Sequence, residues 1–143
     1  MKKAWSPQLL SVLRIIVAFL FIQHGAEKWF AFPAAVMPGG GVAVIGTLPW
    51  FAAIIETLGG TLLILGLFTR PAAFIVAGEM AVAYFTGHAW RGFWPTLNMG
   101  ELAVLYCFIF LFFAAEGGGP WSLDAMLARR RSAAIPVSQI NDQ

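Results

Sequence analysis

Charge is scarce in this sequence. Charged residues make up 11% of its 143 residues, whereas soluble domains average about 25%. Hydrophobic residues make up 59%, and the mean hydropathy is +0.77. Water solvates such a chain poorly, so the composition argues against a soluble domain and indicates a membrane protein. The length suits one domain.

Cysteine is almost absent, since Cys107 is the only one and lies within an apolar run. A single thiol excludes an intrachain disulfide, a CxxC redox motif and a cysteine-based metal site. The formal charge of +2 and the pI near 9.0 come from basic residues concentrated at the two ends. No basic stripe carries interleaved aromatic residues, so we expect no nucleic-acid partner.

The long segments without charge predict the fold. Four apolar stretches each approach the ~20 residues that an α-helix needs to cross a bilayer. Proline and glycine clusters, and a tight turn expected at residues 69–71, separate them. The sequence therefore predicts an all-α membrane protein, a bundle of four transmembrane helices within residues 1–128, followed by a basic and polar tail at 129–143. The expected spans are 9–32, 47–68, 72–88 and 98–115.

Lysine and arginine predict the orientation, because cytoplasmic loops carry an excess of both. Four spans place both termini and Arg70 on one side, together with most of the basic residues, whereas Lys28 and Arg91 fall on the other side. We therefore expect a bacterial inner-membrane protein with cytoplasmic termini. A cleaved signal peptide is the alternative for the first segment. Arg14 interrupts that segment and His24 begins a poor cleavage site, which favours retention.

Ionisable residues inside apolar segments are costly and usually face a partner or a cavity. At ~1.5 Å of rise per residue they form two layers. Arg14 and Glu79 lie ~8 and ~11 Å from the cytoplasmic boundary and are candidates for a buried ion pair. Arg14 reaching the lipid head groups is the alternative. The second layer lies nearer the periplasm and contains the candidates for a polar pocket: His24, Glu27, Lys28, Glu56, His88, Asn98 and Glu101.

The outer layer has several interpretations. Histidine with carboxylate suits a metal, a proton relay or the head group of a quinone. The weak candidates for metal ligands are His24, Glu56, His88 and Glu101, but no HExxH or ExxH spacing is present. A hydrogen-bonded network that only joins the four helices is the simpler interpretation, and we favour it.

Small residues at four-residue spacing place two of these carboxylates inside the bundle. Gly60 follows Glu56 at this spacing, and Gly87 lies two such steps after Glu79. At about 100° per residue, Glu79 and His88 point to opposite sides of a helix. Both can face inward only if that helix ends or unwinds near Gly87.

Several motifs together resemble the DoxX family. They are residues 24–30 (HGAEKWF), 56–60 (ETLGG) with 66–70 (GLFTR), 92–101 (GFWPTLNMGE) and 121–124 (WSLD). Two departures are Trp29, where leucine is commoner, and Met99, where glycine is expected. The resemblance covers about residues 9–124 and implies a four-helix inner-membrane protein. The family name comes from a small subunit associated with quinol oxidation and thiosulfate:quinone oxidoreduction.

The resemblance gives three functional hypotheses. The first is a membrane subunit or partner protein in redox or oxidative-stress metabolism, without a complete active site and joined by a protein partner or further copies of itself. The second is a quinone-interacting or metal-dependent oxidoreductase with a periplasmic His/Glu site. A small-solute transporter formed by oligomerisation is the weakest. Quinone is the candidate cofactor. We expect neither haem nor flavin, because the bundle is small and both histidines lie on the outer side.

Overall fold

The computed structural model describes residues 5–35 and 39–133, and all the regular secondary structure in these ranges is helical. The prediction of an all-α fold is confirmed. The ends of the expected spans shift by a few residues, and the third connection holds two short helices. The elements are α1 Ser6–Phe30, α2 Leu48–Leu65, α3 Thr69–Gly87, the 3₁₀ helix η1 Ala89–Arg91, α4 Pro95–Asn98, α5 Glu101–Glu116 and α6 Leu123–Ala133.

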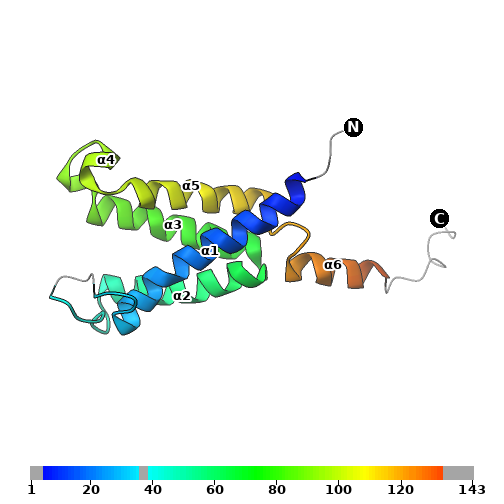
Figure 1. Cartoon of the computed structure of the whole chain (residues 1–143), viewed down its shortest axis with the longest axis horizontal. Coiled ribbons are helices and arrows are strands. Elements are labelled where there is room, and N and C mark those ends of the chain that lie inside the picture. The colour runs from blue at the N-terminus through cyan, green and yellow to red at the C-terminus, as the bar shows by residue number, and fades with distance from the viewer. Residues whose placement is uncertain (1–4, 36–38, 134–143) are drawn as a thin grey trace.

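The long helices form two antiparallel pairs. α1 packs along α2, α3 packs along α5, and α2 and α3 join the pairs in the middle. Figure 1 shows α1 crossing the bundle obliquely, with η1 and α4 at one end. α6 projects from the opposite end, near the start of α1. We call these the α4 end and the α6 end.

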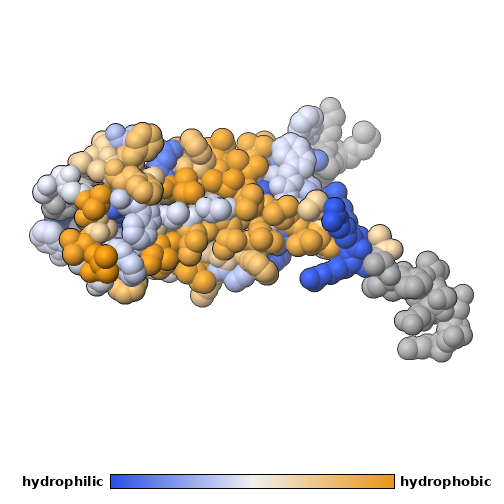
Figure 2. Space-filling view, turned by 90° about the horizontal axis from the view of Figure 1, so that it is seen from below, coloured by the Kyte–Doolittle hydropathy of each residue, from blue (hydrophilic) through white to orange (hydrophobic). Residues whose placement is uncertain are grey.

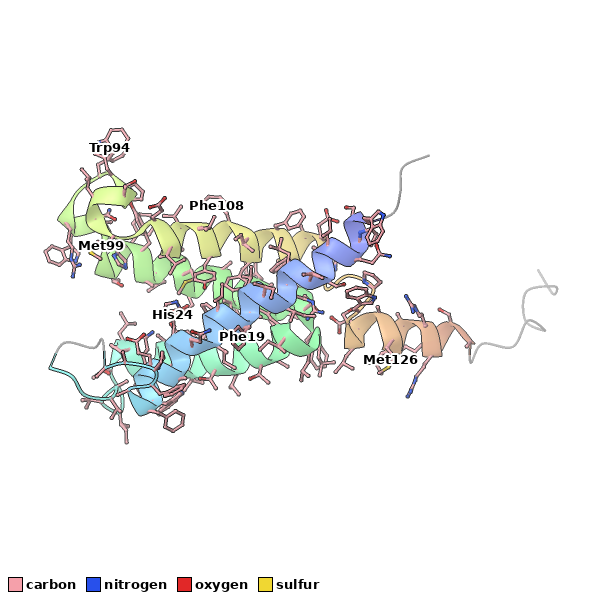
Figure 3. All side chains as sticks on the ribbon, in the orientation of Figure 1. Phe19, His24, Trp94, Met99, Phe108 and Met126 are labelled. Carbon is pink, nitrogen blue, oxygen red and sulfur yellow. The ribbon has the colours of Figure 1, made fainter. Side chains whose placement is uncertain are left out.

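On the face seen in Figure 2, apolar side chains predominate between the two ends of the bundle. Phe19, Phe74 and Phe108 are each more than half exposed, and Figure 3 shows Phe108 pointing away from the bundle. Within the described residues, three segments are long and apolar enough to cross a membrane: Ser6–Phe30, Leu48–Leu65 and Thr69–Arg91. α5 has 16 residues and spans only about 24 Å. The structure therefore supports a membrane protein with three candidate spans, and a fourth span remains a prediction.

Helix α2 ends at a glycine that no other residue could replace without strain. Gly66 has φ 66° and its amide bonds back to Leu63 O at 3.2 Å. A Cβ there would lie 2.5 Å from Cβ of Ser122. The chain therefore turns at 66–68, and α3 already begins at Thr69. The tight turn that we expected at residues 69–71 was misplaced by about three residues.

Arg14 holds the α6 end together. Its side chain is fully buried, with 0% exposure. The guanidinium donates to the last carbonyls of α2, from Leu63 and from Ile64 at 2.7 Å. It also donates to Gly118 O at 2.9 Å and to Trp121 O at 2.8 Å in the loop after α5. One side chain thus satisfies carbonyls that a helix end otherwise leaves unpaired.

The predicted Arg14–Glu79 pair is therefore wrong, as is the alternative in which Arg14 reaches the lipid head groups. Four backbone carbonyls solvate this charge, and the carboxylate that interacts with it is Asp124, not Glu79. Similar depth suggested the pair, but depth along a helix does not define the direction in which a side chain points.

Asp124 caps the start of α3 from α6. Its carboxylate accepts from the amides of Phe68 at 2.9 Å and Thr69 at 2.8 Å. Burial alone would raise the pKa of Asp124. The two amide hydrogen bonds and the charge of Arg14 outweigh burial and hold that pKa below its usual value. The carboxylate form therefore stabilises the fold.

We expect Asp124→Asn to lower the free energy of unfolding by about 1 kcal/mol at neutral pH, because the amide NH₂ that replaces one carboxylate oxygen cannot accept from a backbone N–H. Because the folded pKa is the lower one, the stabilisation is complete above the unfolded pKa of about 3.9 and disappears as pH falls through the folded pKa. Unfolding in detergent at pH 7, 5 and 3 measures this. A gap between variant and wild type that stays constant over this range would contradict the assignment.

Candidate functional site: a polar-ended cavity between α2 and α3

The site begins with an ion pair between α1 and α2. Lys28, in the last turn of α1, places its Nζ 2.8 Å from both carboxylate oxygens of Glu56. Glu56 is 2% exposed and Lys28 is 19% exposed. The lysine stem reaches down from the α4 end to a carboxylate in the middle of α2. The prediction that Glu56 lies inside the bundle is confirmed.

Close helix packing explains this reach. A Cβ on Gly25 would lie 2.5 Å from Oγ1 of Thr57, and one on Gly60 would lie 3.1 Å from Cβ of Ile22. These glycines let α1 and α2 approach each other, as expected for helices in lipid. Gly87 has no atom within 4 Å of such a Cβ, so its predicted packing role is wrong.

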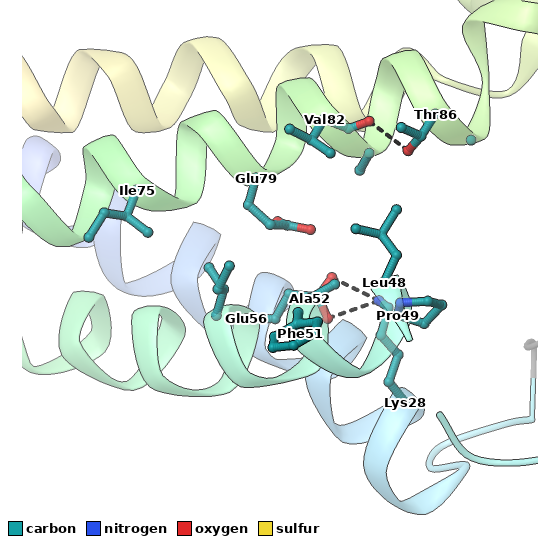
Figure 4. A pocket seen from close by; sticks show the side chains of 13 residues that line it. Lys28, Leu48, Pro49, Phe51, Ala52, Glu56, Ile75, Glu79, Val82 and Thr86 are labelled. Carbon is teal, nitrogen blue, oxygen red and sulfur yellow. Dashed lines mark hydrogen bonds and ion pairs between the residues drawn. The ribbon is translucent and has the colours of Figure 1, made fainter. Parts of the chain in front are cut away.

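Glu79 of α3 faces the Lys28–Glu56 pair across a cavity of about 530 Å³. Figure 4 shows its carboxyl group directed from α3 into the space above the pair. Its Oε2 is buried and has no hydrogen-bond partner among the described residues. A buried polar atom without a partner is uncommon and needs an explanation.

The rest of the cavity is apolar except for the hydroxyl of Thr86. Its walls come from the first half of α2 and the middle and end of α3. Several of these side chains are also half exposed on the outside, including Phe51 (52%) and Ile75 (58%). The cavity thus opens sideways between α2 and α3, toward the surroundings of the bundle. The apolar lining residues are Leu48, Pro49, Phe51, Ala52, Ile55, Ile75, Val82, Ala83 and Gly87.

His24 lies on another face of α1 and does not line this cavity. Its ring stands edge-on to Tyr106 of α5 at 5.9 Å and lies 6.4 Å from the ring of Phe21. Figure 3 shows it between α1 and the α3–α5 pair. Its backbone carbonyl accepts from Nζ of Lys28 at 3.4 Å. His24 is thus connected to the site only through its main chain.

His88 and Asn98 form a separate network at the α4 end. α3 does end at Gly87 as anticipated, but the His88 ring then turns toward Asn98 O, with Nδ1 3.1 Å away. The Asn98 side chain is 1% exposed and bonds Gly92 O and the Gly100 amide, each at 2.8 Å. These contacts stabilise the conformation of the segment that connects α3 and α5.

The single outer pocket predicted from the sequence is therefore wrong. Lys28 and Glu56 come together, Glu79 joins them from the inner layer, and His24, His88 and Asn98 lie elsewhere. Glu27 does not line the cavity, and Glu101 is exposed in the first turn of α5. Over residues 5–35 and 39–133, no three His, Cys, Asp or Glu side chains are grouped as metal ligands. The weak metal hypothesis thus has no ligand set there.

Comparison with known proteins adds the family. The model of the DoxX family matches residues 9–89, which is more than half of the chain. The chain belongs to the DoxX family. The resemblance inferred from the motifs is confirmed, and the matched range contains the whole Lys28, Glu56 and Glu79 site of this DoxX protein.

The relatives of this DoxX protein support its place in a membrane. It is 50% identical over 123 residues to an uncharacterized protein of Haemophilus influenzae, covering 84% of this chain and 91% of the relative. It is 31% identical over 148 residues to an uncharacterized membrane protein of Mycobacterium tuberculosis, covering 91% and 88%. No solved structure matches it.

Proposed function

We propose that this DoxX protein is a membrane subunit or partner protein of redox metabolism that holds a quinone-type molecule in the α2–α3 cavity. One observation carries the proposal: an apolar cavity, open sideways, ends on Lys28, Glu56 and the unpartnered Glu79. Ligand sites commonly combine apolar walls with a few convergent polar groups. A quinone has the matching form, an apolar ring and tail with polar oxygen atoms.

The position of the opening favours a ligand that arrives through the bilayer. The rim residues Phe51 and Ile75 belong to the apolar outer surface of the bundle. A water-soluble substrate would have to cross hydrocarbon to reach them, whereas a lipid-soluble molecule already lies there. The cavity has no grouped metal ligands in the described ranges, so the quinone alternative fits better than the metal-dependent one.

Electron transfer itself is assigned to a partner protein. The described cavity offers one lysine, two glutamates and one threonine hydroxyl, which can bind and orient a ring but cannot themselves accept electrons. The ligand would thus be presented to a redox protein that docks on the bundle.

We expect a cavity-filling variant, Ala52→Phe, to lose at least about 80% of the quinone that co-purifies in mild detergent, because a ring would occupy the ligand's space. Solvent extraction followed by chromatography measures this. Ala115→Phe, which adds the same ring at an exposed site on α5, is the control and should retain the wild-type amount. Wild-type protein without quinone, and with no saturable labelling by an azidoquinone, would overturn the proposal.

We also propose that α5 is a fourth span in the bacterial inner membrane, with the α6 end in the cytoplasm. Arg70 and Arg129–Arg131 lie at the α6 end, in keeping with the excess of basic residues in cytoplasmic segments. The domain boundary expected at residue 128 falls inside α6, and residues 134–143 of the expected tail lie outside the described ranges.

A reporter that is active only in the periplasm tests this topology. Fused after residue 133 it should give no activity, and inserted at Gly40, in the α1–α2 loop, it should be fully active. The opposite pattern would show that the α6 end lies outside the cytoplasm.

A further inference from the structure

The connection between α3 and α5, residues 88–100, has its polarity reversed. Its most buried side chain is the polar one of Asn98, which is 1% exposed. Its large apolar side chains lie outside, each between 64% and 81% exposed: Trp90, Phe93, Trp94, Leu97 and Met99. Figure 3 shows Trp94 pointing away from the bundle. Large apolar side chains are normally buried and polar ones normally face water, so this connection suits surroundings less polar than water.

The main chain of the connection is paired from within where it turns. The Asn98 side chain donates to Gly92 O at 2.8 Å and accepts from the Gly100 amide at 2.8 Å. The amides of Leu97 and Asn98 both donate to Trp94 O at 3.0 Å. Backbone groups that leave water must find partners inside the protein. These hydrogen bonds therefore lower the cost of placing the connection against lipid.

The length of α5 is a second, independent observation. Its 16 residues rise about 24 Å, whereas the hydrocarbon core of a bilayer is about 30 Å thick. α5 begins at Glu101, directly after the connection. The exposed apolar side chains of the connection continue the apolar outside of α5, where Phe108 is also exposed. The connection thus lies where a span of full length would continue.

Charged side chains set the depth of the connection. Arg91 lies within it and Glu101 follows it, and both are exposed. The Arg91 guanidinium carbon lies 5.1 Å from the centre of the Trp90 ring. Charges are costly in hydrocarbon, whereas tryptophan is enriched at the level of the lipid head groups. Exposed tryptophans beside exposed charges therefore fit the head-group region and not the hydrocarbon core.

We infer that residues 88–100 form an interfacial anchor, a surface that binds the phospholipid head groups and the first part of the acyl chains at the α4 end. The anchor completes the short span of α5 and fixes the depth at which the bundle lies in the bilayer. It is independent of any ligand in the α2–α3 cavity, so a failure of the quinone proposal leaves it standing.

Depth-dependent fluorescence quenching tests the anchor in the full chain, reconstituted in vesicles of phosphatidylethanolamine and phosphatidylglycerol. In a Cys107→Ser background, Leu97→Cys or Phe93→Cys carries the fluorophore, and Ser132→Cys on the exposed face of α6 is the control. We expect a lipid spin label near the head group to quench at the two anchor positions at least about fivefold more than at Ser132, because interfacial residues lie at head-group depth. Iodide in the water on both sides should show the opposite order.

Phe108→Cys, on the apolar outside of α5, is the second control and should be quenched most by a spin label near the bilayer centre. Quenching at Leu97 and Phe93 by iodide as strong as at Ser132 would overturn the inference, because the surface would then lie in water. Protection from iodide and from both lipid spin labels would also overturn it, since a second copy of the chain or another protein would then cover the surface. Strongest quenching by the deep spin label would place the connection in hydrocarbon, again contrary to the inference.

Discussion

Replacing Arg14 with methionine should lower the free energy of unfolding by about 4 kcal/mol, one of the two largest effects of a single substitution that we expect in this protein. Each buried carbonyl left without a donor costs about 1–3 kcal/mol. Arg14 donates to four carbonyls, those of Leu63, Ile64, Gly118 and Trp121. Leu63 O also accepts from the Gly66 amide and Gly118 O from the Ser11 hydroxyl, so Ile64 and Trp121 depend on Arg14 most. The costs are not independent, because these carbonyls share one guanidinium. Denaturant unfolding in mixed micelles measures the loss.

Two further variants make this test specific. Arg14→Lys should recover only part of the loss, since an ammonium cannot reproduce the planar fork of donors. Arg91→Met, on an exposed arginine at the α4 end, should change stability by less than about 0.5 kcal/mol. Combining Arg14→Met with Glu79→Gln should give additive losses. A strong coupling energy between these two substitutions would indicate that Arg14 and Glu79 do form an ion pair, contrary to the structure.

The second large effect is expected at the ion pair of the site. Lys28→Met removes the one cation that pairs with Glu56 among the described residues, and the Glu56 side chain is 2% exposed. Breaking a buried pair by removing one partner typically costs about 3–5 kcal/mol. We expect a loss of this size in the same unfolding experiment. Arg129→Met, on an exposed arginine of α6, serves as the control and should have little effect.

The double variant Lys28→Met with Glu56→Leu should regain much of that stability, because it leaves no buried charge behind. The two single losses and the double loss define a coupling energy. A coupling close to zero would show that the pair contributes nothing to the stability of the protein, contrary to this prediction.

The membrane class, the helical fold and the family were all predictable from the sequence. The apolar segments were read from composition, and the family from local motifs such as residues 56–60 and 92–101. Inward placement of Glu56 was also predictable, because the small Gly60 at four-residue spacing puts both on the face that packs against α1. These predictions need only periodicity and composition, which are local properties.

The site was only partly predictable. The sequence gives the depth of each ionisable residue along its helix, and this depth defined the two layers. Which residues share a pocket also depends on how each helix is rotated about its axis and on where it ends. That is why His24 and Glu101 were expected together with Glu56 and are not. Glu79 was assigned to Arg14 for the same reason. The apolar walls of the cavity could not be predicted from the sequence, because their residues are of the same types as residues that face lipid.

The sequence by itself determined that this is a membrane protein, where its helices run and to which family it belongs, because the hydrophobic pattern and the motifs of each segment are local properties. Tertiary structure alone decided the partners of its charges. Arg14 binds the carbonyls at the end of α2 and does not pair with Glu79, because the loop after α5 folds back over that end. Lys28 reached Glu56, and Glu79 kept an unpartnered oxygen, because α2 and α3 diverge enough to leave a cavity between them.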